Sequence, residues 1–487
     1  MSETFREIMD GAWLLYRAGD LPGAERAYRR AVEIDPSVAE AWYLLGAIEQ
    51  VQRKPVEAEA HCRMALALAP QHAGARNNLG VLLLTRREAE EAAECFRAVL
   101  RVQPDHVDAY SNLGTALQML GKHEEAVECY RLALEGRPGH VDAHSNLGNA
   151  LRQLGQLPAA IACYDEAARL APEHPQVRLS RGLAWLQTGD FARGWVEHEW
   201  RFKCPGFALP EFDRPCWDGS SLGGRPILLY ADHGLGDALQ FIRYARAVRK
   251  RGGKVVVACR KPLERILATA PGVWRVAPEG SPISEVEVYA PLMSLPRIFE
   301  TRLETIPAEV PYLSPIARLV QHWRHAFRWR VGNDFKVGVA WQGNPGHAGD
   351  RERSFRLEQL EPLARVPGVR LVGLQQGAGL EQIESLGDRF EVIELGSRQS
   401  DLMDTAALMK SLDLVIVPDT SLAHLAGAIG IPVWLALPVA PDWRWMLGRD
   451  DSPWYPTMRL FRQARWGDWD ELFQRMAAEL ERRIRSR

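Results

Sequence analysis

The sequence predicts an N-terminal all-α solenoid followed by an α/β region made of two parallel-sheet halves. A 34-residue period runs through the first third of the chain, which indicates stacked helical repeats. Beyond it, short apolar runs alternate with helical segments, the pattern of doubly wound parallel sheets. Several of these runs end in polar turns, and ligands bind at that edge of such sheets.

Length and composition exclude several classes of protein. The chain has 487 residues, enough for several domains with large cores. A net charge of −2 provides no overall basic surface for nucleic acid. No apolar run approaches the ~20 residues of a membrane-spanning helix, and residues 1–10 lack the pattern of a secretory signal. We therefore expect a cytoplasmic protein with no transmembrane segment and no nucleic-acid partner.

The seven cysteines predict neither a disulfide framework nor a zinc site. Cys95, Cys129 and Cys163 are 34 residues apart, so they mark one position of a repeat. The total is odd, and no CxxC pair is present. Free, buried thiols are the expected state.

Three residue types recur every 34 positions before residue 183. The recurring positions are Pro36, Pro70, Pro104, Pro138 and Pro172; Gly46, Gly80, Gly114, Gly148 and Gly182; and Ala58, Ala92, Ala126 and Ala160. Small residues let two helices cross closely, and a proline ends the second helix of each unit. The pattern resembles the tetratricopeptide repeat, with five units in residues 1–174. That resemblance implies a solenoid with a concave face.

An altered sixth unit is expected in residues 175–207. It contains Gly182 at the repeat position but passes into an aromatic segment, 195–202. Atypical terminal repeats cap solenoids, and this aromatic content predicts that the cap docks onto the next domain. A linker rich in Gly, Pro, Asp and Ser follows in residues 208–224.

Asparagine recurs within the repeats, at Asn78, Asn112 and Asn146. An amide offers a donor and an acceptor together, so a row of amides can pair with an extended peptide backbone. The peptide-binding superhelix of O-GlcNAc transferases is similar, with an asparagine ladder in the same register. That resemblance implies a polypeptide acceptor or partner in the groove. The alternative is that these amides hydrogen-bond between neighbouring repeats.

The first α/β half is expected in residues 225–330. A buried strand, 226–231, leads into a loop, 232–237, and then a helix. The Gly-Asp pair of this loop resembles the opening of heptosyltransferase-like glycosyltransferases. The resemblance implies that Asp237 is the general base and that Gly234 and Gly236 admit the acceptor. Asp237 could instead only complement a helix dipole, and His233 is a rival base because histidine titrates near neutrality.

The second half, residues 331–487, contains the most informative segment, 415–430. An apolar strand ends at Pro418 and passes into a small-residue helix, so free backbone N–H groups gather where a phosphate could bind. The segment resembles the donor-sugar site of heptosyltransferase-type enzymes. That resemblance implies a GT-B fold of two Rossmann-like halves. The donor-binding residues that it implies here are Asp419, Thr420, Ser421 and His424.

Other polar residues of this half are donor-binding candidates. Arg351 and Arg353, in a polar loop, are expected to stabilise a departing diphosphate in place of a metal. Gln342, Asn344 and Gln375 end strands and could contact the base or ribose. Asp468 and Asp470 have the spacing of a metal-binding pair, but we expect them to cap the last helix. No metal and no cofactor beyond a nucleotide-sugar co-substrate is expected.

Two C-terminal features are interpreted as packing elements. The aromatic residues of 441–456 suit packing between domains better than stacking with a base or sugar. The closing helix, 469–484, carries one apolar face and is expected to pack across the domains.

The resemblances together imply a metal-independent glycosyltransferase, inverting by family likeness, whose repeats recruit a protein acceptor. A saccharide or lipid-linked acceptor is the alternative among enzymes. A non-catalytic scaffold that carries a decayed transferase domain is the alternative outside them.

Overall fold

The computed structural model describes residues 3–207, 212–328, 334–347 and 349–486. The chain forms two compact units, residues 1–177 and 178–487. The expected linker, 208–224, and the expected boundary between the α/β halves, 330/331, each fall partly or wholly outside the described residues. Each unit is described by itself.

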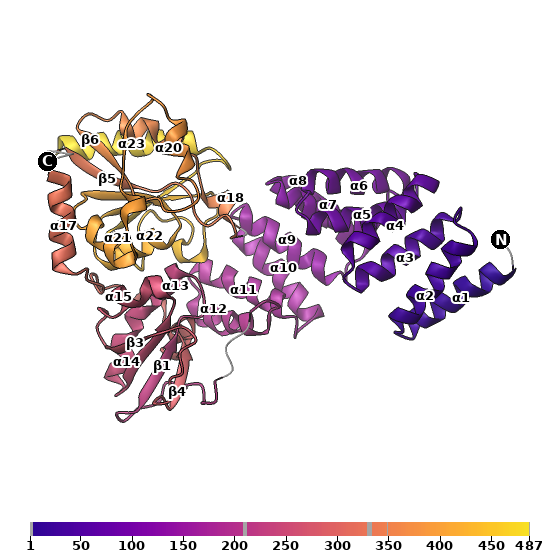
Figure 1. The fold of residues 1–487 in the computed structure, drawn as a ribbon, viewed down its shortest axis with the longest axis horizontal. Coiled ribbons are helices and arrows are strands. Elements are labelled where there is room, and N and C mark those ends of the chain that lie inside the picture. The colour runs from indigo at the N-terminus through magenta and orange to yellow at the C-terminus, as the bar shows by residue number, and fades with distance from the viewer. Residues whose placement is uncertain (1–2, 208–211, 329–333, 348, 487) are drawn as a thin grey trace. The chain divides into compact units, whose positions relative to one another are not determined.

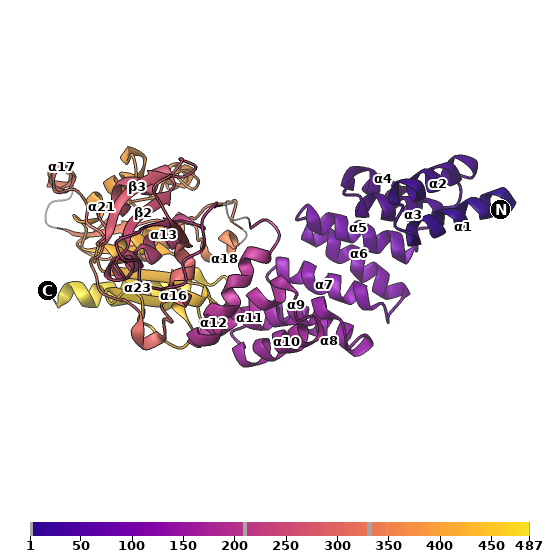
Figure 2. The same cartoon turned by 90° about the horizontal axis from the view of Figure 1, so that it is seen from below.

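The first unit consists of consecutive helix pairs (Figures 1 and 2). The helices are α1 Glu3–Arg17, α2 Leu21–Ile34, α3 Ala39–Val51, α4 Pro55–Leu68, α5 Ala73–Thr85, α6 Ala89–Val102, α7 Val107–Met119, α8 His123–Gly136, α9 Val141–Gln153 and α10 Leu157–Leu170. The second helix of each pair ends two residues before a recurring proline. Helix α6, for example, has Gln103 as its C-cap, and Pro104 follows. The period of the sequence therefore sets where these helices stop.

The recurring glycines are where the two helices of a pair touch. A Cβ atom on Gly80 would lie 2.6 Å from the ring of Phe96, and one on Gly148 would lie 2.6 Å from the ring of Tyr164. Real Cβ contacts are longer than this, so a larger residue would push the helices apart. Glycine in the first helix thus makes room for a buried aromatic ring in the second.

The second unit begins with the altered helix pair and continues into a small parallel sheet (Figure 1). The altered pair is α11 Pro175–Thr188 and α12 Phe191–His198, followed by the 3-10 helix η1 Glu199–Lys203. The strands are β1 Pro226–Tyr230, β2 Lys254–Cys259, β3 Val273–Pro278 and β4 Val288–Pro291, in the order β3-β2-β1-β4. The helical elements are α13 Leu235–Phe241, η2 Ile242–Tyr244, α14 Ala245–Lys250, η3 Lys261–Leu263, α15 Glu264–Leu267, η4 Leu292–Ser294, α16 Leu295–Ile298 and η5 Leu303–Thr305.

A larger parallel sheet forms the rest of the second unit. Its strands are β5 Phe335–Val339, β6 Val369–Gly373, β7 Val392–Glu394, β8 Leu414–Pro418, β9 Val433–Leu437 and β10 Met458–Arg462, in the order β10-β9-β8-β5-β6-β7. The helical elements are α17 Ala317–Arg328, α18 Asp350–Arg353, η6 Leu357–Leu360, α19 Glu361–Ala364, α20 Glu381–Ser385, η7 Gly396–Arg398, α21 Leu402–Met409, α22 Ser421–Ala428, η8 Trp443–Trp445 and α23 Trp469–Arg485.

Both sheets follow one topology. Counted within its own half, each has the strand order 3-2-1-4, and the larger sheet adds two strands beyond the fourth. In such sheets the strand order reverses between strands 1 and 4, and the crevice at their carboxyl ends is where ligands bind. These switch points lie between β1 and β4 in the small sheet and between β5 and β8 in the large one.

One buried apolar cluster includes residues of both sheets and of the altered helix pair, among them Leu229, Val417 and Trp195. Trp195 of α12 makes edge contacts with Trp443 at 5.2 Å and with Trp454 at 6.5 Å. The aromatic residues of the cap and of segment 441–456 therefore pack together. The described part of the linker also contacts the small sheet, because the Trp217 N–H donates to the carbonyl of Tyr289 in β4 at 2.7 Å.

The expectation that the closing helix packs across the domains is wrong. The apolar face of α23, including Leu472 and Phe473, is buried with Phe355, Trp434 and Phe461 of the larger sheet's own layer. Its nearest helical neighbour is α19. Asp468 is the N-cap of α23, since its carboxylate accepts from the Glu471 N–H at 3.1 Å, as the sequence predicted.

Candidate functional site

The first turns of α13 and α22 touch each other. Helix α13 follows β1, and α22 follows β8, so each begins at the carboxyl end of a strand that borders a switch point. A Cβ atom on Gly236 would lie 2.8 Å from Cδ2 of His424 and 3.6 Å from Cα of Ser421. Gly236 therefore permits the contact, and the N-termini of two helices that follow strands of different sheets meet at one place. Helices α13 and α22 are labelled in Figure 1.

Asp237 lies in the first turn of α13 and faces the larger half. Its Oδ2 accepts a hydrogen bond from the Gly234 N–H at 2.9 Å, and its Oδ1 forms an ion pair with Nη2 of Arg444. The carboxylate thus caps its own helix, which agrees with the alternative that Asp237 complements the helix dipole. It also bridges the two halves through Arg444. The side chain is 20% exposed, so it is accessible from one side.

Arg444 is the central residue of this site that sequence reasoning missed. It is 7% exposed, donates from Nε to Oε1 of Gln240 at 2.6 Å, and donates from Nη1 to Oδ1 of Asp442 at 2.8 Å. Burial alone would lower the pKa of Arg444, but Asp442 and Asp237 raise it above the ordinary value. Arg444 stands between Trp443 and Trp445, and this aromatic segment predicts packing and gives no separate signal for the arginine.

Thr420 and Asp419 form the turn between β8 and α22. Thr420 is the N-cap residue by backbone geometry, yet its side chain caps nothing, and its buried Oγ1 has no hydrogen-bond partner in the described part of the chain. Burial raises the pKa of the Asp419 carboxyl to about 6, and the neighbouring Asp442 carboxylate adds to the rise. A buried hydroxyl without a partner is costly, so this turn has unused capacity to bind a ligand.

The two candidate arginines have different surroundings. Arg353 donates from Nη1 to the Asp419 carbonyl at 2.9 Å and from Nε to Oδ1 of Asp350 at 3.3 Å, so it is fixed beside the turn. Arg351 is exposed on the same short helix, α18. The structure therefore places Arg353, and not Arg351, against the β8–α22 turn.

His424 is buried in the second turn of α22 and stacks on Trp445 at 5.4 Å. Its Nδ1 is hydrogen-bonded to the Tyr455 hydroxyl at 2.9 Å. Burial, together with the Arg444 guanidinium, lowers the pKa of His424 well below its ordinary value. The ring is therefore neutral near pH 7 and can contribute a hydrogen bond but no positive charge.

His233 lies in the loop between β1 and α13. Its Nδ1 is 2.8 Å from the Asp232 carbonyl oxygen, which can only accept, so the proton sits on Nδ1. Nε2 of the neutral ring then carries the free lone pair that a base requires. The ring also contacts Phe207 at 4.7 Å, and both bases proposed from the sequence remain candidates.

Three further predicted ligand contacts look different in the structure. Gln375 is 3% exposed, and its amide binds backbone groups only, including the Trp341 N–H at 3.0 Å and the Ala378 carbonyl at 2.8 Å. It closes the loop and has no capacity left for a base or ribose. Gln342 accepts from the Gln382 side chain at 3.1 Å, and Asn344 is exposed and accepts from the Gly346 N–H at 2.9 Å.

The asparagines of the repeats do not form a continuous ladder with one another. Asn112 donates to Oδ1 of Asn77 at 3.2 Å, a bond between neighbouring helix pairs that matches the structural alternative. Asn78 and Asn146 are half-buried and have no hydrogen-bond partner among the described residues. Asn112 is therefore bonded within the solenoid, whereas the amides of Asn78 and Asn146 are available to a ligand.

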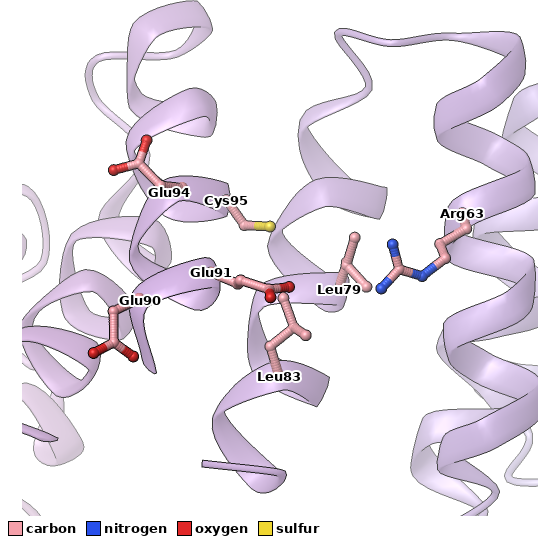
Figure 3. A pocket seen from close by; sticks show the side chains of 7 residues that line it. All are labelled: Arg63, Leu79, Leu83, Glu90, Glu91, Glu94 and Cys95. Carbon is pink, nitrogen blue, oxygen red and sulfur yellow. The ribbon is translucent and has the colours of Figure 1, made fainter. Parts of the chain in front are cut away.

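A hollow of about 340 Å³ lies elsewhere in the first unit, between α4, α5 and α6, and none of the three asparagines lines it (Figure 3). Figure 3 shows Leu79, Leu83 and Cys95 directed into it, whereas Glu90 and Glu94 point away. Within the described ranges, no cluster of three or more His, Cys, Asp or Glu side chains is arranged to hold a metal ion. No described helix is long and apolar enough to cross a membrane.

A sequence profile described as tetratricopeptide repeat matches residues 9–73, 77–141 and 145–194. The N-terminal region is an array of tetratricopeptide repeats. The last match runs into α12, so the sixth helix pair, although altered, keeps the repeat pattern. This confirms the repeats predicted from the 34-residue period.

Protein FlbA of Caulobacter vibrioides is 29% identical over 320 residues, which cover 61% of this chain and 53% of FlbA. The chain therefore spans about half the length of the curated relative that it matches. Among solved structures, PilF of Pseudomonas aeruginosa is 22% identical with a TM-score of 0.38, covering 42% of this chain and 93% of PilF. The type IV pilus biogenesis factor PilW is 19% identical with a TM-score of 0.39, covering 43% and 96%.

Proposed function

We propose that residues 178–487 are a metal-independent glycosyltransferase of GT-B architecture. In this proposal the larger half binds a nucleotide-diphosphate sugar, and the smaller half supplies the base. The observation that carries the proposal is the contact between the first turns of α13 and α22, which puts a carboxylate of one half beside the helix N-terminus of the other. That is the arrangement that group transfer between two bound substrates needs.

The groups around the β8–α22 turn suit a departing diphosphate. Sugar transfer leaves negative charge on the phosphate oxygens, and fixed donors can stabilise that charge without a metal. The backbone N–H groups that open α22, the guanidinium of Arg353 and the unpartnered Thr420 hydroxyl supply such donors. Ser421 adds a second hydroxyl in the first turn of α22.

The base in this proposal is Asp237, with His233 as the alternative. A base must accept the proton of the attacking hydroxyl as that oxygen bonds to the anomeric carbon. Asp237 is partly exposed beside the turn, and Arg444 fixes its orientation. His233 keeps Nε2 free because Nδ1 is bound to the Asp232 carbonyl.

The repeats recruit the acceptor, which we propose to be a polypeptide. Tetratricopeptide repeats commonly bind peptides, and the amides of Asn78 and Asn146 have no hydrogen-bond partner within the part of the chain that the structure describes. Replacing Asn78, Asn112 and Asn146 together by alanine tests this role. A several-fold rise in the acceptor KM is expected, and unchanged acceptor binding would remove the peptide groove from the proposal.

The activity itself is tested by incubating the full chain with a panel of nucleotide sugars and following the release of nucleoside diphosphate. We expect release that depends on an added protein acceptor and persists in a chelator. Release that depends on a saccharide or lipid-linked acceptor would assign the alternative enzyme function. Binding of a nucleotide without release under any condition would leave a repeat scaffold with a non-catalytic α/β domain.

A further inference from the structure

Arg201 of the altered sixth repeat is buried at the edge of the small sheet. The residue is 1% exposed, although its guanidinium carries a full charge. Its Nη2 donates to Oδ2 of Asp232 at 3.2 Å and to Oγ of Ser294 at 2.8 Å. Its Nη1 donates to Oε1 of Glu199 at 2.6 Å. Two carboxylates and a hydroxyl thus surround one buried guanidinium.

The partners of Arg201 lie at the switch point of the small sheet. Asp232 follows β1 by two residues, and Ser294 ends η4, the 3-10 helix that follows β4 directly. Arg201 therefore spans the carboxyl ends of the two strands between which a ligand crevice would open. Here a side chain of the cap fills that position, and both of its terminal nitrogens donate hydrogen bonds to protein groups.

The same contacts fix the loop that carries both candidate bases. The Asp232 carboxylate is held by Arg201 and also accepts from the Met293 N–H at 3.3 Å. The Asp232 carbonyl in turn accepts from Nδ1 of His233. His233 lies two residues before the start of α13. The position of Asp232 therefore determines both the orientation of the His233 ring and the start of the helix that carries Asp237.

His198 completes the arrangement from the repeat side. It lies 34 residues after Tyr164, so it occupies the position that holds a buried aromatic ring in every preceding pair except the second, which has Cys62. Its Nδ1 accepts from Nη1 of Arg201 at 3.1 Å, because arginine can only donate. Burial lowers the pKa of His198 well below its ordinary value, which suits a neutral acceptor.

We propose that Arg201 is a positioning residue for the 232–237 loop, so that the sixth repeat is a working part of the α/β unit and not only the end of the solenoid. This inference rests on the proposed function for its kinetic consequences but not for its structural one. Loss of Arg201 lets Asp232 shift and misplaces the base, whereas the donor site on the larger sheet keeps its geometry. The expected defect is therefore in turnover and not in donor binding.

The test uses the full chain with Arg201→Lys, Arg201→Met and the double variant Arg201→Met/Asp232→Asn, which removes both charges of the pair. Arg297→Met is the control, because Arg297 reaches the same Glu199 at 3.4 Å from an exposed position. For Arg201→Met and the double variant we expect kcat to fall about a hundredfold, with nucleoside diphosphate affinity within about twofold of wild type. Arg201→Lys should recover part of kcat, and Arg297→Met should resemble wild type.

Hydrogen exchange of the backbone amides of residues 231–237 provides a readout independent of activity. Faster exchange confined to that loop in the double variant is expected. Unchanged exchange and unchanged kcat would overturn the positioning role, as would equal losses of kcat and of nucleotide affinity, which indicate a general structural defect. If the wild-type chain shows no turnover, the proposed function fails, and the exchange result alone decides the role of Arg201.

Discussion

The two switch points of the α/β unit have the same strand topology but differ in the side chains that lie at them. At the small sheet, the carboxyl ends of β1 and β4 are bridged by Arg201, whose two terminal nitrogens donate to protein groups, while its Nε has no hydrogen-bond partner among the described residues. At the large sheet, the turn after β8 has a buried hydroxyl without a partner in the described chain and a carboxyl whose pKa is raised. The small-sheet crevice thus holds a side chain of the protein itself, whereas the turn after β8 keeps a hydroxyl without a partner among the described residues, and that turn is where we expect a ligand.

The comparison also assigns different roles to the helices that begin there. Helix α13 presents a carboxylate, Asp237, whereas the first turn of α22 presents Thr420, Ser421 and backbone N–H groups. A negative side chain suits a base, and exposed donors suit an anion. The contact between the two first turns makes these complementary ends one site.

The largest expected effect on turnover comes from replacing Asp237, the candidate base beside the small sheet. Asp237→Asn should lower kcat by about 10² to 10⁴, because the amide cannot accept the acceptor proton, while nucleoside diphosphate affinity stays near wild type. The measurement is steady-state kinetics with calorimetric binding in parallel. Asp213→Asn is the control, since Asp213 is a fully exposed carboxylate of the linker that precedes this half. Full turnover in Asp237→Asn would transfer the base role to His233.

The link between the two sides is tested by Arg444→Met. Removal of this buried guanidinium leaves Asp237 and Asp442 without their charge partner, so the free energy of unfolding should fall by about 3 to 5 kcal/mol. Denaturant unfolding measures this change. The comparison variant Arg459→Met breaks an ion pair of 2.6 Å with Glu479 that is largely solvent-exposed, and should cost less than about 1 kcal/mol. Equal costs would mean that Arg444 does not join the halves.

The incomplete large-sheet crevice is tested by Thr420→Val. The hydroxyl has no partner to lose among the described residues, so stability should not fall, whereas nucleoside diphosphate affinity should drop about tenfold or more. Thr457→Val is a matched control, because its Oγ1 is also buried and unpartnered among the described residues. Thr457 precedes β10 and so lies at the amino ends of the strands of the same sheet, away from the carboxyl end of β8. A loss of affinity in both variants, or in neither, would contradict the assignment.

The raised pKa of Asp419 predicts a pH dependence of stability. Because its folded-state pKa, about 6, exceeds the ordinary value, the fold favours the protonated carboxyl. That contribution is complete below about pH 4 and is lost as the pH rises through about 6. Asp419→Asn should therefore be more stable than wild type at pH 7.5 by about 3 kcal/mol, with little difference at pH 4.

The control for this pH dependence is Asp451→Asn. A hydrogen bond from Arg449 lowers the pKa of Asp451, so its contribution has the opposite sign and is lost as the pH falls. Chemical denaturation at pH 4 and pH 7.5 measures both variants. An Asp419→Asn protein that is less stable than wild type at pH 7.5 would show that the carboxylate is favourably paired.

The sequence predicted elements whose signal is local. The repeats follow from a fixed period, and strands such as β2 and β9 are continuous apolar runs. The sequence does not predict the edge strands β3, β4 and β10; in β3 and β10, charged residues such as Arg275 and Arg459 interrupt the apolar pattern, because one side of each strand lacks a neighbouring strand.

The site was predictable only in part, because it depends on long-range contacts. The turn at Thr420 has a local signature, but Arg444 reaches Asp237 across 207 positions of sequence separation, which no local pattern reveals. Gln375 shows the opposite error: a polar residue at a strand end can face a ligand or close its own loop, and here the loop uses every hydrogen bond that the amide offers.

The most direct test of the account is a crystal structure of the full chain with a bound nucleoside diphosphate. The account predicts phosphate oxygens within hydrogen-bond distance of the backbone N–H groups that open α22 and of the Thr420 hydroxyl, with the Asp237 carboxylate facing the same space. A diphosphate bound at the β1–β4 end of the small sheet, or no binding at millimolar concentration, would contradict it.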